Sequence, residues 1–292
     1  MHSSLNVDHP GYPMRSHLLV ATDFSTPAKN MIARLEALRI HGAEQITLLY
    51  VRRERYPTED SAGHENYYQA LLDDQAKQLR ERGWQVEVRN ELGRAGSTIV
   101  EVGEEVGAEL IVMANRGRSA MEDVLLGSVA SDVLERSPLP VFLFCDRAPT
   151  VEAETPDEPL WNRVIHPTDF SGAADKALDW IPTLVDRQPV PVMLMHVVDD
   201  RYYGPREGDE RRDKLQKRGQ RLDEQGVGDI DRDVIFGRPK KCLSDATEHY
   251  PEALFVMGFH GHGWLEDLVL GGVARSIARK ATNHLLFVPG SE

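Results

Sequence analysis

Two aspartates are the first residues whose position suggests chemistry. Asp23 and Asp169 each stand in the string Thr-Asp-Phe-Ser, directly after a short apolar run. Two residues later each is followed by a serine, Ser25 or Ser171, of the type that begins a helix. A carboxylate at this place can accept a hydrogen bond from an amino or hydroxyl group of a ligand, or it can hold a turn of the backbone. The residues alone leave both interpretations open.

A glycine-spaced loop also occurs twice. One copy runs from Ala114 through Gly117, and nine residues then precede Gly127 and Ser128. The other copy begins Gly258-Phe-His-Gly261-His262, and nine residues precede Gly271 and Gly272. The end of each loop opens a helical pattern, and the first N–H groups of a helix with little side-chain bulk around them can bind an anion. The alternative is that these glycines only shape a turn and permit close packing.

These paired features belong to an internal duplication. The string at Asp23 recurs at Asp169, Leu48–Val51 is answered by Leu194–Val197, and Leu110–Met113 is answered by Leu254–Met257, each about 145 residues later. Five ordered matches with almost constant spacing indicate two copies of one domain. We expect domains at residues 15–147 and 160–290, joined by an acidic, proline-rich linker at 148–159.

Each half alternates apolar, strand-sized runs with helical patterns. In the first half, strands are expected near 17–21, 46–51, 86–88, 110–113 and 141–144, with a helix between each pair. This order predicts an α/β fold with a parallel sheet that is covered on both faces. In such a sheet, ligands bind beyond the carboxyl ends of the strands, where Asp23 and Gly117 stand. The second half follows the same order, but Glu207–Gln225 has few apolar anchors and predicts a frayed helix.

Composition narrows the classes of function. With 34 basic and 47 acidic residues the net charge is −13, so we expect neither nucleic acid nor an anionic membrane as a partner. No apolar run is long enough to cross a bilayer, and the first 15 residues do not resemble a signal peptide. Cys145 and Cys242 have no metal-binding spacing and are expected to be buried thiols in the reducing cytoplasm.

The loops resemble those of a known family. Ser119 with Leu125-Leu126-Gly127-Ser128, and the string Leu268 to Gly271, are close to the loop motif of universal stress proteins. The chain therefore resembles a tandem universal stress protein over both of its halves. The resemblance implies two Rossmann-like domains of the adenine nucleotide alpha hydrolase-like type, each with a five-stranded parallel sheet. It also implies that the two halves pair through their last strands, Val141–Phe144 and Leu285–Val288, as an intramolecular pseudo-dimer, with further homodimerisation left open.

The resemblance also implies a ligand, because some members bind ATP or AMP, with or without Mg²⁺. In those members the aspartate lies against the adenine, and the loop lies around the ribose and phosphates. Carried over residue by residue, the site of the first half is Thr22, Asp23, Val51, Met113, Ala114, Arg116, Gly117, Arg118, Gly127, Ser128 and Val129. That of the second half is Pro167, Thr168, Asp169, Val197, Met257, Gly258, His260, Gly261, His262, Gly271, Gly272 and Val273.

Each half departs from the family motif at one place. Ala114 stands where the motif has its first glycine. Alanine costs about 1 kcal/mol there if the backbone must be left-handed, and it then risks crowding the ribose, but it is harmless if the position needs only a small residue. Gly272 stands where the motif has Ser or Thr, and loses a hydrogen bond worth roughly 1.5–3 kcal/mol. We therefore expect the first half to prefer ATP over AMP more strongly than the second does. Arg116 and Arg118 either support that preference or are merely solvated, and His260 with His262 lacks a third metal ligand.

Three functions are compared on these grounds. The first is a regulatory stress-response module in the cytoplasm that binds adenine nucleotide and acts on an unknown protein partner. The second is a pseudo-dimeric scaffold that binds partner proteins or another small ligand and has vestigial nucleotide sites. The third is an enzyme such as an adenylating ligase, which is disfavoured because no pyrophosphate loop and no paired nucleophile and base occur. We expect slow ATP hydrolysis at most.

Overall fold

The computed structural model describes residues 17–39, 42–53, 61–117, 126–148, 159–201, 205–259 and 271–290. In the first half the strands are β1 (His17–Ala21), β2 (Gln45–Arg52), β3 (Gln85–Leu92), β4 (Leu110–Ala114) and β5 (Val141–Phe144). The helices are α1 (Thr26–Ala33), α2 (Glu36–Arg39), α3 (Ser61–Glu81), α4 (Ala95–Glu105) and α5 (Ser128–Arg136).

The second half repeats this order. Its strands are β6 (Arg163–Pro167), β7 (Val192–Val198), β8 (Ile230–Phe236), β9 (Ala253–Phe259) and β10 (Leu285–Pro289). Its helices are α6 (Gly172–Leu178), α7 (Ile181–Val185), α8 (Pro205–Glu224), α9 (Pro239–His249) and α10 (Gly272–Lys280). The duplication inferred from short strings is thus a duplication of every element.

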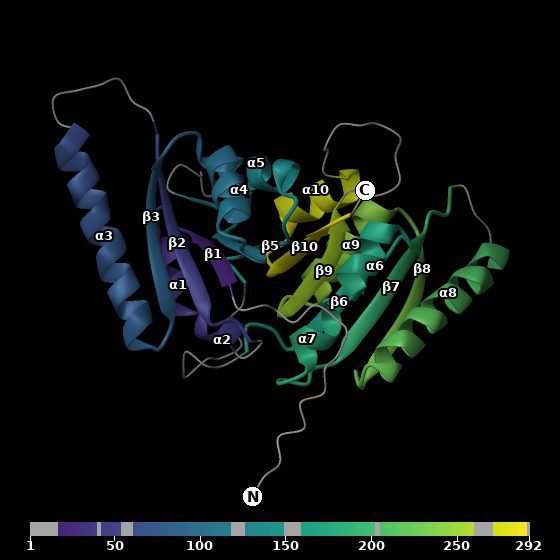
Figure 1. The fold of residues 1–292 in the computed structure, drawn as a ribbon. Coiled ribbons are helices and arrows are strands. Elements are labelled where there is room, and N and C mark those ends of the chain that lie inside the picture. The colour runs from purple at the N-terminus through teal and green to yellow at the C-terminus, as the bar shows by residue number, and fades with distance from the viewer. Residues whose placement is uncertain are drawn as a thin grey trace, which may run out of the picture.

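All ten strands form one sheet in the order β3-β2-β1-β4-β5-β10-β9-β6-β7-β8. Within each half the pairs are parallel, as the alternating strand and helix pattern predicts. Helices cover both faces of the sheet. Helices α1–α3 and α6–α8 pack on one face, and α4, α5, α9 and α10 pack on the other. Figure 1 shows the outcome, with α3 and α8 at the two outer ends of the molecule.

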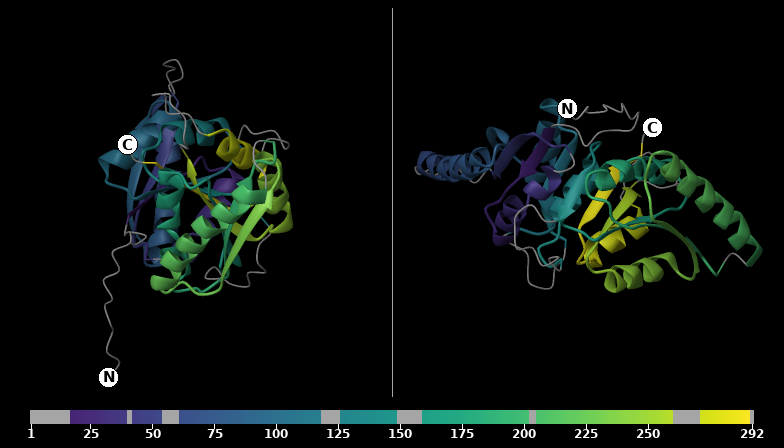
Figure 2. Two further views of the ribbon diagram at one scale, coloured as in Figure 1. Left: turned by 90° about the vertical axis from the view of Figure 1, so that its right-hand side faces the viewer. Right: turned by 90° about the horizontal axis from the view of Figure 1, so that it is seen from below.

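The halves join through β5 and β10. These strands are antiparallel, and Leu286 stands opposite Phe142 while Phe287 stands opposite Val141. All four side chains are almost completely buried. The pairing predicted for the last strands is confirmed, and the right-hand view in Figure 2 shows the halves side by side across this seam.

Helix α8 corrects one expectation. The sequence predicts a frayed helix over Glu207–Gln225, but α8 is continuous for 20 residues. Leu215 and Leu222 are its buried anchors, and Arg218 and Arg221 form ion pairs with α6. Long-range ion pairs of this kind are invisible to a periodicity argument, which counts only apolar anchors.

The two cysteines are free thiols, but only one of them matches the expectation of burial. Cys145 is buried, whereas Cys242 is partly exposed. No described helix is both long and apolar enough to cross a bilayer.

Candidate functional site

The turn after β1 is held by its own side chains. Thr22 Oγ1 accepts from the Phe24 amide at 3.2 Å, and Asp23 Oδ1 accepts from the Ser25 amide at 3.0 Å. Ser25 then caps α1 by accepting from the Ala28 amide at 3.3 Å. The turn forces Phe24 to a φ of 60°, a left-handed conformation that costs a bulky residue about 1–2 kcal/mol.

The turn after β6 repeats each of these bonds. Asp169 Oδ1 accepts from the Ser171 amide at 2.9 Å, and Thr168 Oγ1 accepts from the Phe170 amide at 3.0 Å. Phe170 has a φ of 65°. The structural interpretation of the two aspartates is therefore correct for one of their oxygens. Strained turns that are retained in both copies are typical of functional sites.

The loop after β4 meets the turn after β1. A Cβ on Gly117 would overlap Asp23 Oδ2, so only glycine allows the loop to lie against this carboxylate. The Gly127 amide donates to Asn115 O at 2.7 Å, which brings the start of α5 back to the end of β4. Gly127 is the N-cap of α5 and has no side chain to cap it, so the N–H groups at Ser128 and Val129 begin the helix without a side-chain acceptor. The structure thus brings together the aspartate, the glycine loop and an anion-type helix end.

Arg116 lies in this loop but is already paired. Its guanidinium is 3.2 Å from Asp146 Oδ2, and Asp146 also accepts from the Asn30 side chain on α1. Both side chains of the pair are largely buried, at 17% and 14% exposed. Sequence reasoning missed Asp146, which lies two residues after the end of β5 and carries no motif. Arg116 is accordingly not a solvated surface residue.

Ala114 does not have the energetic cost of a left-handed backbone. It ends β4, and it is not among the residues with positive φ. Its counterpart Gly258 shows what the position contacts, because a Cβ there would lie 2.5 Å from the Ala173 carbonyl carbon and 2.7 Å from the Ala174 nitrogen. The position therefore sets how closely the first helix of each half approaches the sheet. The halves therefore differ in helix packing at this position, and crowding at a ribose stays a prediction.

The start of α10 has a neighbour that the sequence did not indicate. Gly271 is the N-cap and has no side-chain cap, and Gly272 is the first helical residue. Lys240 Nζ lies 3.4 Å from the place of a Cβ on Gly272. In the first half Gly96 occupies the position of Lys240 and faces Asp132 instead. A cation at the positive end of a helix is unfavourable unless an anion joins them.

The remaining proposed contacts are mostly core residues. Met113 and Met257 are buried on the face of α4, α5, α9 and α10. Four partly buried valines pack against the same core: Val51, Val129, Val197 and Val273. Pro167 ends β6, where the pairing of β6 with β9 has already stopped at Ile165.

Some residues of both loops fall outside the part of the chain that the structure describes. Arg118, His260, Gly261 and His262 lie outside the described residues, as do Ser119, Leu125 and Leu268. Among the residues that the structure describes, no group of three or more His, Cys, Asp or Glu side chains is arranged to hold a metal ion.

Fold and site define a duplicated doubly wound α/β protein with a ligand-type turn and loop in the first half and the matching turn in the second. The model of the universal stress protein family matches residues 14–144 and again residues 161–289. The chain therefore belongs to the universal stress protein family, as a tandem member.

Curated relatives agree with this assignment. A universal stress protein of Methanocaldococcus jannaschii is 28% identical over 153 residues, which cover 44% of this chain and 94% of the relative. A universal stress protein of Mycobacterium tuberculosis is 27% identical over 192 residues, which cover 63% of this chain and 62% of the relative.

Solved structures share the whole two-domain arrangement. A universal stress protein from Archaeoglobus fulgidus superimposes with a TM-score of 0.74 at 22% identity, covering 94% of this chain and 97% of that one. A Pseudomonas aeruginosa protein described as functionally unknown gives a TM-score of 0.67 at 14% identity, covering 94% and 92%. At these identities the likeness concerns the fold.

Proposed function

We propose that each half binds one adenine nucleotide, ATP or AMP, with or without Mg²⁺, beyond the carboxyl ends of its strands. The chain then works as a regulatory stress-response module in the cytoplasm, with slow ATP hydrolysis at most. Its folding units are residues 15–147 and 160–290, joined by a linker at 148–159.

The observation that carries this proposal is the convergence of Asp23, Gly117 and the start of α5. A carboxylate accepts hydrogen bonds only, so it suits the amino group of an adenine or the hydroxyls of a ribose. The α5 end, with Gly127 before it, offers N–H groups and a positive partial charge to phosphate oxygens. The carboxylate of Asp23 therefore suits the donors of the adenine or ribose, and the N–H groups of α5 suit the acceptor oxygens of the phosphates.

The residues present fit such a ligand in both halves, but by different means at the phosphate end. Ser128 offers a hydroxyl at the start of α5, whereas Gly272 at the start of α10 is accompanied by the ammonium of Lys240. Charge-assisted bonds are stronger than neutral ones, so Lys240 can replace what Gly272 lacks. Arg116 contributes only after it leaves Asp146. The placement of Lys240 near Gly272 and the pairing of Arg116 with Asp146 both weaken the argument that the first half prefers ATP more strongly than the second. That preference remains a prediction.

The proposal is tested by the small molecules that are released on denaturing protein purified without added nucleotide. Mass spectrometry should detect adenine nucleotide near or above half a mole per mole of chain. Protein free of nucleotide, which also fails to bind added ATP or AMP, would instead favour the scaffold, with vestigial pockets.

A further inference from the structure

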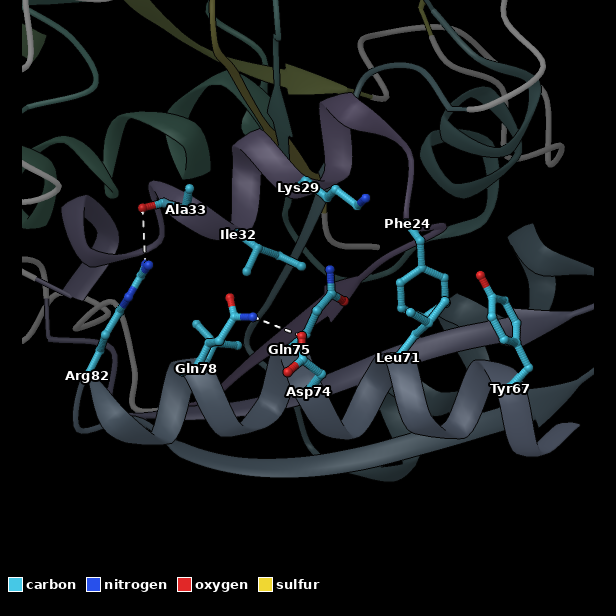
Figure 3. A pocket seen from close by; sticks show the side chains of 11 residues that line it. Phe24, Lys29, Ile32, Ala33, Tyr67, Leu71, Asp74, Gln75, Gln78 and Arg82 are labelled. Carbon is cyan, nitrogen blue, oxygen red and sulfur yellow. Dashed lines mark hydrogen bonds between the residues drawn. The ribbon is translucent and has the colours of Figure 1, made fainter.

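A cavity of about 400 Å³ lies between α1 and α3, and Phe24 of the turn after β1 lines one end of it. Phe24, Ile32, Leu71 and Leu79 provide its apolar lining. Figure 3 shows Lys29 on α1 opposite Gln75 and Asp74 on α3, with Phe24 and Tyr67 at one end and Arg82 at the other. Its volume is within the range of pockets that hold small organic ligands, roughly 300–1,000 Å³.

In the second half, two ion pairs occupy the corresponding space between α6 and α8. Arg218 on α8 makes a two-pronged contact with Asp175 on α6, at 2.7 and 2.9 Å. Arg221, one turn further along α8, pairs with Asp179, which directly follows α6. Partial burial raises the pKa of the Asp179 carboxyl, although Arg221 and Asp175 remain 45% and 40% exposed.

The duplication identifies the residues that stand at these positions in the first half. Gly83 and Gly226 end α3 and α8 with positive φ, and Gln75 and Arg218 each lie eight residues before them. Lys29 and Asp175 each lie four residues after their capping serines.

In the same way Gln78 corresponds to Arg221, and Ala33 corresponds to Asp179. Where the second half has two arginine–carboxylate pairs, the first half therefore has an amide facing a lysine and an amide facing an alanine. The cavity is the space between α1 and α3 that lacks the ion pairs present between α6 and α8.

In the first half, Gln75 and Lys29 beside the cavity lack the partners that their counterparts have between α6 and α8. Gln75 is 9% exposed, and its Oε1 is buried without a hydrogen-bond partner. Lys29 forms no ion pair with any residue that the structure describes. Asp74 lies on the facing helix, but its carboxylate accepts from the Gln78 side chain at 2.9 Å. Lys29 and Arg82 against Asp74 give the lining one excess positive charge.

We propose that this cavity is a binding site for a small aromatic carboxylate that carries an N–H or O–H donor. The carboxylate pairs with Lys29, the donor serves the carboxamide of Gln75, and the ring lies against Phe24, Ile32 and Leu71. This site goes beyond the proposed nucleotide function and is independent of it, because none of these contacts involves Asp23, Gly117 or α5.

Indole-3-acetate is a suitable probe, and its uncharged isostere indole-3-acetamide is the matched control. In calorimetric titrations of the full chain we expect the acid to bind about tenfold more tightly than the amide. Hydrogen exchange should slow in α1 and α3 when the acid is added, with α6 and α8 unchanged. Lys29→Met should bring the affinity for the acid down to that for the amide.

The double variant Lys29→Asp with Gln75→Arg introduces the ion pair of the second half into the first. It should close the cavity and lower binding of the acid by more than about tenfold, with ATP binding unchanged. Arg218→Gln, which alters only the second half, should leave binding of the acid as it was.

Three results would overturn the proposal: no saturable binding of millimolar indole-3-acetate, equal affinity for acid and amide in the unaltered chain, or undiminished binding in the double variant. If the double variant does not fold, Lys29→Met decides, because Lys29 is an exposed residue outside the core.

Discussion

Asp23 and Asp169 each use one carboxylate oxygen to hold the turn that follows the first strand of their half. In the proposed function, the ligand binds to a group that already has this structural task. This double use explains why the sequence left two interpretations open: the same residue type, at the same place, satisfies both. Asparagine can separate the turn from ligand binding, because it keeps one side-chain oxygen to accept the turn's amide but replaces the other oxygen with a donor.

Asp169→Ala removes the acceptor of the Ser171 amide and relaxes the turn at Phe170. We expect it to lower the free energy of unfolding by about 1–2 kcal/mol in the absence of nucleotide. Asp169→Asn should keep the unfolding temperature within about a degree, because its side-chain oxygen still accepts that amide. Thermal unfolding of both variants tests this; equal losses in the two would show that the turn needs the charge.

Buried histidines make stability depend on pH, and burial also lowers the pKa of His196. Burial lowers the pKa of His166 to about 4 and that of His284 to about 3. In the unfolded chain histidine titrates near pH 6.5, so below that value the unfolded state binds protons that the folded state refuses. Stability is therefore complete above about pH 6.5 and falls as the pH is lowered toward 4.

Between pH 7 and pH 5, His166 and His284 should each cost about 2 kcal/mol of unfolding free energy, and His196 adds to this loss. Urea unfolding at the two pH values measures the sum. His166→Val, which introduces the residue that the first half has at Val20, should remove about 2 kcal/mol of the loss. A pH slope that this variant leaves unchanged would contradict the assignment.

At the scale of elements, the halves differ in how closely the first helix approaches the fourth strand. Gly258 permits α6 to come within contact distance of β9, whereas α1 packs less closely against β4, which ends in Ala114. This asymmetry accompanies the open cavity under α1 and the ion pairs between α6 and α8. The departure from the family motif at residue 114 thus coincides with a difference in helix placement.

Gly258→Ala should destabilise the protein by about 1–3 kcal/mol, because its Cβ has no space against the backbone of α6. The converse change, Ala114→Gly, should cost less than about 1 kcal/mol. Differential scanning calorimetry of the two variants compares them directly. A harmless Gly258→Ala would mean that α6 shifts freely, and the packing argument would then fail.

Strands and short helices were predictable here because their signals are local. Ser25 with Pro27 indicates the start of α1, and Gly83 indicates the end of α3. The continuity of α8 was missed because it depends on partners more than 40 residues away, such as Asp175 for Arg218. Asp146 and Lys240 were missed for the same reason: neither has a motif, and only the folded chain brings each to its partner.

On the scale of the whole molecule, the seam between β5 and β10 makes one sheet from two domains. Phe142 and Phe287 are buried in it, and His284 accepts a hydrogen bond from the Cys145 amide across it at 3.1 Å. The repeat, the edge-strand argument and the family resemblance were enough to predict this pairing. They did not indicate that a buried histidine would lie in the seam.

Separate halves, residues 1–147 and 158–292, should associate when mixed, because each alone exposes an apolar edge strand. Light scattering after size exclusion should show a one-to-one complex or homodimers, but no free monomers at micromolar concentration. Phe142→Asp should prevent association, and Leu92→Asp on the outer edge should not, since Leu92 is 54% exposed. Stable monomers of both unaltered halves would contradict the proposed role of the seam.

The central claim is that the chain binds adenine nucleotide at the convergence of Asp23, Gly117 and α5 and at its counterpart near Asp169. Its most direct test is a calorimetric titration of ATP into the full chain and into the double variant Asp23→Asn with Asp169→Asn. We predict saturable binding at two sites per chain, with affinity reduced at least about tenfold in the double variant and its unfolding temperature retained. Absence of saturable binding at millimolar ATP, or equal affinity in the two proteins, would contradict the claim.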